Sequence, residues 1–334
     1  MKLVTYTQTN QLKQARPGAL VADTVIDLQK AAAWAQHNCE LALTPMPDSL
    51  LGLIQAGTDA ADYARQVLAE VARAGEPTSL CDAQGQPFAF QREAVQLQTP
   101  ITPVSLRDAY AFEQHVRKAS ENRGRQVPEQ WYRAPVFYYT NAQTIIGQDA
   151  RLIQPRYTRA LDYELEIAAV IGKPGINLQP EDAASQIFGF TIFNDWSARD
   201  VQLAEMKTGL GPAKSKDFAS SLGPCIVTVD ELADRATARP GVFDLQMTAR
   251  VNGQEKSRAN FSDIYWSFGQ IIARISEETP ILPGEVIGSG TVGTGCLLEL
   301  TRGEGPWLQP SDVVELEIER IGLLRNQIWG ARSE

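Results

Sequence analysis

The chain has 334 residues, of which 43% are hydrophobic and 21% are charged, and its 31 Lys+Arg against 40 Asp+Glu give a formal net charge of −9. This composition excludes global disorder and supplies enough apolar residues to bury the cores of about two domains. The acidic balance, without a basic stripe in the sequence, argues against nucleic-acid binding.

The N-terminal segment MKLVTYTQTNQLKQ lacks the apolar core of a signal peptide. No apolar run approaches the roughly 18–20 residues of a membrane span, so we expect a soluble, cytoplasmic protein. The four cysteines, Cys39, Cys81, Cys225 and Cys296, lie far apart and form no CxxC pair. We therefore expect reduced thiols rather than a disulfide framework or a zinc ribbon.

The first hundred residues differ in pattern from the rest. Short strands are expected near residues 3–6, 19–21 and 25–28, and helices near 30–36, 49–56 and 59–74. The last helix has an apolar stripe that includes Val67 and Val71, and Gly75 and Pro77 end it. No cluster of ionisable residues occurs here. We therefore predict a small N-terminal α/β domain at 1–95, acting as a scaffold or a lid.

Beyond residue 100, strand-like and helix-like segments alternate. Helices are expected at 108–120, 181–186, 197–206 and 265–277, and strands at 136–139, 163–171, 188–194, 224–229, 242–251, 286–289 and 313–321. In the last strand Val314, Leu316 and Ile318 alternate with glutamates, which indicates one buried and one solvent-exposed face. This many non-repeating strands indicates a mixed α+β fold built on curled β-sheets.

Two glutamates share one face of the strand expected at 163–171. Residues i and i+2 of a strand point to the same side, so Glu164 and Glu166 project together while Leu165 and Ile167 face a core. Two carboxylates this close repel each other unless a cation or a proton lies between them. A solvated acidic face is the alternative, because strand carboxylates usually face water. The choice depends on further acids nearby.

Further polar residues follow the next apolar strand. Asp195 stands at its C-terminal end, and Arg199 and Gln202 share one face of the helix expected after it. Lys214 and Lys216 lie in a downstream loop of small residues. Taken singly, each has an ordinary structural role: Asp195 as a helix cap, Arg199 as an ion-pair partner and the lysines as solvated charges.

The order of these groups resembles the fumarylacetoacetate hydrolase family. The resemblance rests first on Glu164-x-Glu166, then on the segment NDWSARDVQ at 194–202, and then on Lys214. The motifs contain several residues each and occur in the family's order. They are specific for the superfamily and much less so for the substrate.

Later segments extend the resemblance. Residues 288–293 (GSGTVG) and 297–300 (LLEL) are similar to the family's Gly-Thr loop and its glutamate-bearing strand, and residues 260–266 (NFSDIYW) are similar to the stretch before its late helix. The likeness spans residues 100–334. It implies a β-roll-like catalytic domain at 96–334, with largely antiparallel curled sheets and flanking helices.

The resemblance implies a metal site formed by four carboxylates, Asp108, Glu164, Glu166 and Asp195. A set of oxygen ligands without histidine or cysteine favours a hard cation. Mg²⁺ is the first choice, and Ca²⁺ or Mn²⁺ are alternatives to it. Four carboxylates exceed the charge of a divalent cation by two, so nearby basic side chains would offset the excess and attract an anionic substrate.

The chain has only two histidines, His37 and His115. His115 follows Asp108 by seven residues, which matches the family's spacing between its first carboxylate ligand and its catalytic histidine. The resemblance therefore implies that His115 is a general base, a role that suits histidine near neutral pH, and that Glu299 orients it. A solvent-exposed position is the alternative for His115, and we expect His37 on the surface.

Other residues match groups around the substrate. The resemblance implies that Arg199, Gln202 and Lys214 meet a developing oxyanion. It also implies contacts with the substrate from Arg199, Gln202, Tyr110, Tyr138 and Thr291. Lys216 has no counterpart in the resemblance, and we expect it to be structural.

The reaction implied is metal-dependent hydrolysis of a C–C bond in a small anionic diketo acid, of the fumarylacetoacetate or acylpyruvate type. A lyase or isomerase of the same superfamily, acting on oxaloacetate or a hydroxydienoate, is the first alternative, and the presence of His115 and Glu299 favours hydrolysis over it. A non-catalytic module with a structural Ca²⁺ site is the second alternative. A homodimer is implied by the resemblance alone. Fold and ligands do not choose among these reactions.

Overall fold

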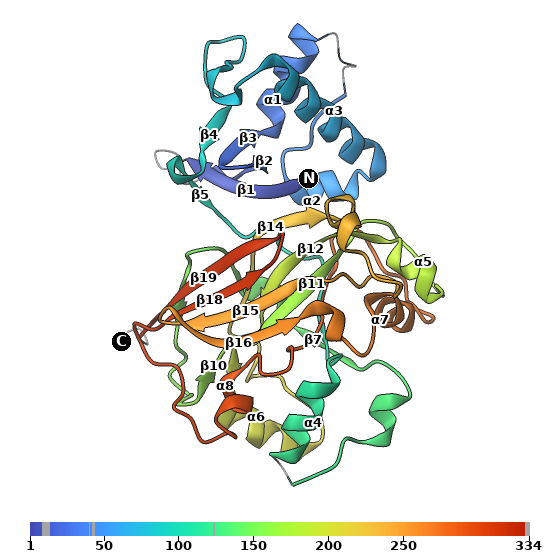
Figure 1. Cartoon of the computed structure of the whole chain (residues 1–334), viewed down its shortest axis with the longest axis vertical. Helices are drawn as coiled ribbons and strands as arrows, with labels where there is room; N and C mark the ends of the chain where they lie inside the picture. The colour runs from blue at the N-terminus through green and yellow to red at the C-terminus, as the bar shows by residue number, and fades with distance from the viewer. Residues whose placement is uncertain (9–13, 40, 42–43, 123, 331–334) are drawn as a thin grey trace.

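The computed structural model describes residues 1–8, 14–39, 41, 44–122 and 124–330. Within these ranges the chain forms a twelve-stranded sheet, a five-stranded sheet and a two-stranded ribbon. Helices surround the sheets: one group packs on the N-terminal strands, a second flanks the sheets, and α4, α6 and α8 gather at the end of the molecule away from the N-terminus (Figure 1).

The twelve-stranded sheet combines the N-terminal strands with strands from the middle and later parts of the sequence. Its strands are β1 (Lys2–Gln8), β2 (Arg16–Val21), β3 (Thr24–Asp27), β4 (Ala89–Gln91), β5 (Val95–Leu97), β6 (Leu106–Ala109), β7 (Phe137–Thr140), β8 (Ile145–Ile146), β11 (Leu165–Ile171), β12 (Ile187–Asn194), β14 (Ser220–Thr228) and β17 (Val286–Gly288). The order is β4-β3-β2-β1-β14-β12-β11-β17-β6-β7, with β5 paired to β1 and β8 to β14.

The smaller sheets complete the β structure. The five-stranded sheet has the order β16-β15-β18-β19-β9 and is formed by β9 (Arg151–Ile153), β15 (Gln246–Val251), β16 (Gln254–Asn260), β18 (Val313–Ile318) and β19 (Gly322–Trp329). The ribbon pairs β10 (Leu161–Asp162) with β13 (Ser197–Ala198). Parallel pairs join β8 to β14, β6 to β17 and β9 to β19, and the other pairings between these strands are antiparallel. The predicted mixed, largely antiparallel fold is confirmed.

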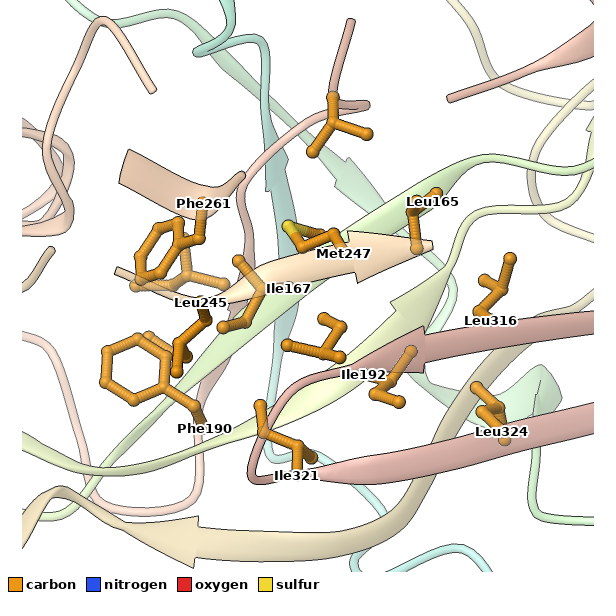
Figure 2. Close-up of a cluster of buried hydrophobic side chains, with 14 of the residues drawn as sticks. Leu165, Ile167, Phe190, Ile192, Leu245, Met247, Phe261, Leu316, Ile321 and Leu324 are labelled. Atoms are coloured by element: carbon orange, nitrogen blue, oxygen red, sulfur yellow. The ribbon is translucent and has the colours of Figure 1, made fainter. Parts of the chain in front are cut away.

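The main core lies between the two larger sheets. Figure 2 shows Ile167 and Ile192 of the twelve-stranded sheet among Met247, Leu316 and Leu324 of the five-stranded sheet. Odd-numbered residues of β11 face this core, because successive side chains of a strand point to opposite faces. The even-numbered side chains face the opposite side of the sheet, which is also buried. This alternation turns the two glutamates at the start of β11 away from the main core.

The described helices are α1 (Leu28–Asn38), α2 (Leu50–Gln55), α3 (Thr58–Ala74), α4 (Glu113–Glu121), α5 (Pro180–Ala184), α6 (Arg199–Glu205), α7 (Phe268–Ile275) and α8 (Leu297–Leu300). Short 3-10 helices are η1 (Pro77–Ser79), η2 (Arg92–Ala94), η3 (Glu129–Tyr132), η4 (Ala142–Thr144), η5 (Met206–Thr208), η6 (Val229–Arg235) and η7 (Phe261–Asp263). Across the described ranges, no helix combines the length and the hydropathy that crossing a bilayer requires. All four cysteines are free thiols, as the sequence predicts.

The N-terminal strands are hydrogen-bonded to the rest of the protein. Strand β1 pairs with β14, where Leu3 lies opposite Ile226, and the N-terminal amine donates to Thr228 Oγ1 at 2.5 Å. The three predicted N-terminal helices are present as α1, α2 and α3. The predicted boundary between residues 95 and 96 falls inside β5, and the division into two domains stays a prediction.

Two predicted elements are wrong. The helix expected at 108–120 is instead strand β6 followed by α4, because the parallel pairing of Asp108 with Gly288 extends Leu106–Ala109. Glu299 lies on the short helix α8 rather than on a strand. The backbone N–H groups of Leu297 and Leu298 donate to the Asp162 carboxylate, so an acid distant in sequence satisfies the first turn of this helix.

Candidate active site

Four carboxylates meet at one edge of the twelve-stranded sheet. Glu164 precedes β11 and Asp195 follows β12, and these ends adjoin because the two strands are antiparallel, with Leu165 opposite Asn194. Strand β17 pairs with β11 on one side and with β6 on the other, which brings Asp108 to the same place. All four side chains are at least 95% buried, as the exposed fractions of 0–5% show.

Three of the carboxylates form a compact cluster. One oxygen each of Asp108, Glu164 and Glu166 lies within 4.8 Å of the others. The backbone N–H of Gly290 donates to Asp108 Oδ1 and to Glu166 Oε2, at 3.0 Å in both cases. Thr291 Oγ1 donates to Glu166 Oε1 at 3.3 Å. The Gly-Thr loop therefore holds two of the predicted ligands in position.

The electrostatics of the cluster favour a cation. Burial, together with the negative charge of Asp195, raises the pKa of Asp108 to about 8. Burial and the charges of Asp108 and Glu164 raise the pKa of Glu166 well above its ordinary value. Burial also raises the pKa of Asp195, although Lys216 opposes it. Carboxylates with raised pKa values hold their protons up to a higher pH. A divalent cation that binds to them displaces these protons.

Glu164 behaves differently because two buried cations contact it. Lys216 Nζ lies 2.5 Å from Glu164 Oε2 and 2.6 Å from Asp195 Oδ2, and Arg199 Nη2 lies 2.8 Å from Glu164 Oε1. Burial alone would raise the pKa of Glu164, but the charges of Lys216 and Arg199 outweigh it and hold that pKa well below its usual range. Glu164 is therefore the carboxylate of the cluster that its neighbours most favour in the ionised form.

The structure corrects the prediction for the two lysines. The side chain of Lys214 is 60% exposed and pairs with Asp217 at 3.1 Å, outside the cavity. Lys216, which was expected to be structural, is 3% exposed and reaches the carboxylates. The residues after Ala213 turn back on themselves, since the amides of Lys216 and Asp217 both donate to its carbonyl oxygen. This turn directs one lysine outward and the other inward, which spacing alone does not reveal.

His115 and Glu299 form a buried pair, as the resemblance implies. The Nδ1 atom of His115 is hydrogen-bonded to Glu299 Oε1, and both residues are 4% exposed. Glu299 Oε2 accepts from the backbone N–H of Thr294 at 2.9 Å. Because a carboxylate only accepts hydrogen bonds, we assign the proton to Nδ1, which leaves Nε2 as the basic nitrogen. His37, in contrast, is exposed on α1.

A cavity of about 310 Å³ connects these groups. The predicted site residues that line it are Asp108, Tyr110, His115, Tyr138, Glu164, Glu166, Arg199, Gln202 and Thr291. Asp195 and Glu299 stand behind this wall, where each holds a lining residue: Tyr138 donates its hydroxyl to Asp195, and Glu299 binds His115. Of the twelve predicted site residues, nine thus line the cavity, two contact residues that line it, and Lys214 lies outside it.

The described residues fit a hard divalent cation. The Oδ1 atom of Asp195 is buried and, within the described chain, has no hydrogen-bond partner. A buried anionic oxygen without a partner is costly, and a cation beside it would remove that cost. The clustered donors are carboxylate oxygens, which suit Mg²⁺, Mn²⁺ or Ca²⁺. Asp108, Glu164, Glu166 and Asp195 would hold it.

Asp162 is a site residue that the sequence analysis missed. Its Oδ2 atom accepts from Arg199 Nε at 2.8 Å and from the amide of Leu298 at 3.0 Å. It therefore connects Arg199 to the helix that carries Glu299. The sequence did contain a pattern that could have identified it, because Asp162, Glu164 and Glu166 are spaced two residues apart. The strand is interrupted at residues 163–164, between β10 and β11, and Asp162 pairs with Arg199 instead of joining the carboxylate cluster, which only the structure shows.

Comparison with known proteins agrees with this geometry. The family model described as "Fumarylacetoacetate (FAA) hydrolase C-terminal" matches residues 105–329. Fumarylacetoacetase of Arabidopsis thaliana is 28% identical over 87% of this chain and 82% of its own length. Oxaloacetate tautomerase YisK of Bacillus subtilis is 30% identical over 93% of this chain and 95% of its own length.

A solved structure shares the fold. It is the maleylpyruvate hydrolase from Sphingobium sp. SYK-6, in complex with manganese(II) ion and pyruvate, and it is 20% identical with a TM-score of 0.68. The alignment covers 99% of this chain and 100% of that one. The family includes hydrolases and tautomerases, and its enzymes act on small organic acids. This chain belongs to the fumarylacetoacetate hydrolase family.

Proposed function

We propose that this protein is a divalent-metal-dependent hydrolase that cleaves a C–C bond in a small diketo acid, of the acylpyruvate or fumarylacetoacetate type. The observation that carries the proposal is the buried His115–Glu299 pair on the wall of the cavity that also holds the carboxylate cluster. Hydrolysis needs a base for water beside a site that binds the substrate's oxygens. The cavity combines the two.

Asp108, Glu164, Glu166 and Asp195 would hold the cation, with Mg²⁺ our first choice and Mn²⁺ or Ca²⁺ as alternatives. When bound, it supplies Lewis-acid stabilisation of negative charge on the substrate's oxygens. Lys216 and Arg199 offset part of the remaining negative charge of the carboxylates, so an anionic substrate is not repelled.

His115 would act as the general base. With Nδ1 bound to Glu299, the Nε2 atom takes a proton from water, and the carboxylate stabilises the imidazolium that forms. The hydroxide adds to the acyl carbonyl carbon, and the bond between this carbon and the methylene carbon then breaks. The methylene carbon takes a proton, so one molecule of water yields one carboxylic acid and one oxo acid, which is a 2-oxo acid when the substrate is an acylpyruvate.

The cationic and amide groups would meet the oxyanion that hydroxide addition creates. Lys216 replaces Lys214 in this role, alongside Arg199 and Gln202. Arg199 Nη1 donates to Gln202 Oε1 at 2.9 Å, which turns the Gln202 amide nitrogen toward other acceptors. Fixed charge of this kind typically contributes the largest part of the rate enhancement. The substrate contacts proposed are Tyr110, Tyr138, Thr291, Arg199 and Gln202.

Tautomerisation of oxaloacetate is the second candidate. The relative that supports it, YisK of Bacillus subtilis, aligns over 95% of its own length. A tautomerase moves a proton between carbon and oxygen and needs no added water. The same base and cation therefore serve either reaction, and the products distinguish them.

Product analysis by NMR tests the proposal. Acetylpyruvate, fumarylacetoacetate and oxaloacetate are each incubated with protein and Mg²⁺, and again with a chelator. We expect two fragments from a diketo acid only when Mg²⁺ is present, and we expect His115→Ala to abolish their formation while the exposed His37→Ala leaves it unchanged. Keto–enol exchange of oxaloacetate without cleavage of either diketo acid would establish the second candidate instead. We also expect a homodimer in light scattering.

A further inference from the structure

We propose that the distal half of the active-site cavity is a receptor for an uncharged acyl chain, so that the enzyme acts on monocarboxylic 2,4-dioxo acids in preference to dicarboxylic ones. The inference rests on the proposed function, which it narrows from diketo acids in general to one class of them. Three features of the described cavity wall carry it.

The first feature is a change of polarity along α6 and η5. Arg199, Gln202 and Met206 follow one another at intervals of three and four residues and line the same cavity. Seven residues of helix extend about 10 Å, so Met206 lies about that far along the axis from Arg199. With increasing distance from the carboxylate cluster, the side chains of the wall therefore change from the cationic Arg199 to the neutral amide of Gln202 and then to the apolar thioether of Met206. Leu210 and Pro212 continue the apolar wall beyond the helix.

The second feature is a similar change of polarity along other elements of the cavity wall. On α4, His115 is followed one turn later by Ala119, and both line the cavity. Helix α4 packs against α8, which contributes Leu298 to the wall. Strand β7 contributes Tyr138 beside the carboxylates, and Val136 lies just before that strand. Figure 1 shows α4, α6 and α8 at the same end of the molecule, and each of these helices contributes residues to the cavity wall.

The third feature is the position of the cations. Among the described residues that line the cavity, Arg199 and Lys216 are the only lysine or arginine side chains, and both contact Glu164 at the proximal end. Lys214 pairs with Asp217 outside the cavity. Arg117 on α4 pairs with Glu113 and does not line the cavity either. A second carboxylate at the distal end would meet apolar side chains, which is unfavourable without a partner.

Leu210 is positioned to cover the acyl chain of the substrate. It lines the cavity while 89% of its surface is exposed, an unusual arrangement for a large apolar side chain. Its neighbours Gly209 and Gly211 have φ angles of +81° and +100°, and a Cβ atom added at either would meet nothing within 4 Å. Glycine adopts backbone conformations that other residues disfavour, so this segment can adjust at a low steric cost. Leu210 is placed to close over an apolar acyl chain.

Calorimetry with two 2-oxo acids of equal length tests the proposal without requiring turnover. The probes are 2-oxohexanoate and 2-oxoadipate, added to the full-length protein with Mg²⁺. They share the 2-oxo acid head and differ only in the terminal group. We expect 2-oxohexanoate to bind at least about tenfold more tightly. Equal or tighter binding of 2-oxoadipate would overturn the proposal.

Two variants and a matched control localise the effect. Met206→Arg places a guanidinium at the distal wall, and we expect it to reverse the preference in favour of 2-oxoadipate. We expect Leu210→Ala to weaken the binding of 2-oxohexanoate by about tenfold and to leave the binding of 2-oxoadipate nearly unchanged. The control is Leu203→Arg, because Leu203 is an exposed leucine of α6 that does not line the cavity. A reversal by Leu203→Arg as large as that by Met206→Arg would contradict a local receptor.

Turnover separates this inference from the proposed function. Cleavage of acylpyruvates with kcat/KM rising by about fourfold for each methylene added to the acyl chain, up to the capacity of the cavity, supports both. Cleavage that is faster for a dicarboxylic diketo acid leaves hydrolysis established and overturns the acyl receptor. If no diketo acid is cleaved, the proposed function fails, and the calorimetric ratio of the two probes still decides whether the distal half accepts an uncharged chain.

Discussion

At the residue scale, the partners of each carboxylate decide its charge. Lys216 and Arg199 lower the pKa of Glu164, whereas burial raises the pKa values of Asp108 and Glu166. The four acids of the site are therefore not equivalent, although the sequence presents them alike. We therefore expect a bound cation to promote full ionisation of the four carboxylates, and this expectation leads to a test.

The first prediction concerns pH and metal. Asp108 has a folded-state pKa of about 8 and an unfolded-state value of about 4. A raised folded-state pKa contributes stability below the unfolded value that is lost as the pH rises through the folded one. The melting temperature of the metal-free protein should therefore fall between about pH 4 and pH 8. Added Mg²⁺ should raise it, and by more at pH 8 than at pH 5. If the increase in melting temperature caused by Mg²⁺ does not grow with pH, the carboxylate cluster is not the metal site.

The second prediction compares the two lysines. Lys216→Met leaves buried carboxylates without their closest cation, so we expect the metal-free protein to lose about 3–5 kcal/mol of unfolding free energy. With Mg²⁺, hydrolysis should fall at least roughly 100-fold, because an oxyanion-binding group is removed. Lys214→Met is the control, and denaturant titration and initial rates should match the wild type. Equal losses in both variants would argue against the assignment of Lys216.

At the element scale, helices and strands with a regular hydrophobic pattern were predictable from the sequence, and short elements defined by distant partners were not. The alternation in β11 and β18 revealed strands and their buried faces, and the helical stripe revealed α3. Strand β6 and helix α8 were missed, because distant partners define them: β17 pairs with β6, and Asp162 binds the first amides of α8. Local sequence does not contain such partners.

The third prediction tests the loop after β17. Gly290 has φ +77°, and a Cβ atom there would lie 2.6 Å from the carbonyl oxygen of Ala109. Gly290→Ala should displace the amide that binds Asp108 and Glu166, and so weaken Mg²⁺ binding by about 10–100-fold in calorimetry. Gly253→Ala is the matched control, because its φ is +74° and the added Cβ meets nothing within 4 Å. Both variants bear the backbone strain, so equal metal affinities would refute the role of Gly290.

At the scale of the whole molecule, the N-terminal strands share one sheet with strands from residues 106–288. The family resemblance predicted the fold of the later part of the chain and most of the residues that line the cavity, because its motifs lie in continuous segments. It could not foresee that β1 pairs with β14, since hydrogen bonds between strands 220 residues apart leave no local pattern. The order of strands therefore comes from the structure alone.

The fourth prediction follows from this shared sheet. A fragment of residues 96–334 would expose the edge of β14 and the apolar side chains that β1 covers. We expect it to aggregate, and co-expression with residues 1–95 to restore a soluble complex, both measured by size-exclusion chromatography. A monodisperse fragment with normal Mg²⁺ binding would instead show that the catalytic part is independent of the N-terminal strands.

The central claim is that His115 activates water for cleavage of a C–C bond. The most direct test is a short incubation of acetylpyruvate with protein and Mg²⁺ in H₂¹⁸O, followed by mass spectrometry of the acetate, with an enzyme-free sample to measure exchange into the substrate. The account predicts one ¹⁸O atom from solvent in each acetate released, and none released by His115→Ala. Exchange of the methylene hydrogens without release of acetate would contradict it and identify a tautomerase.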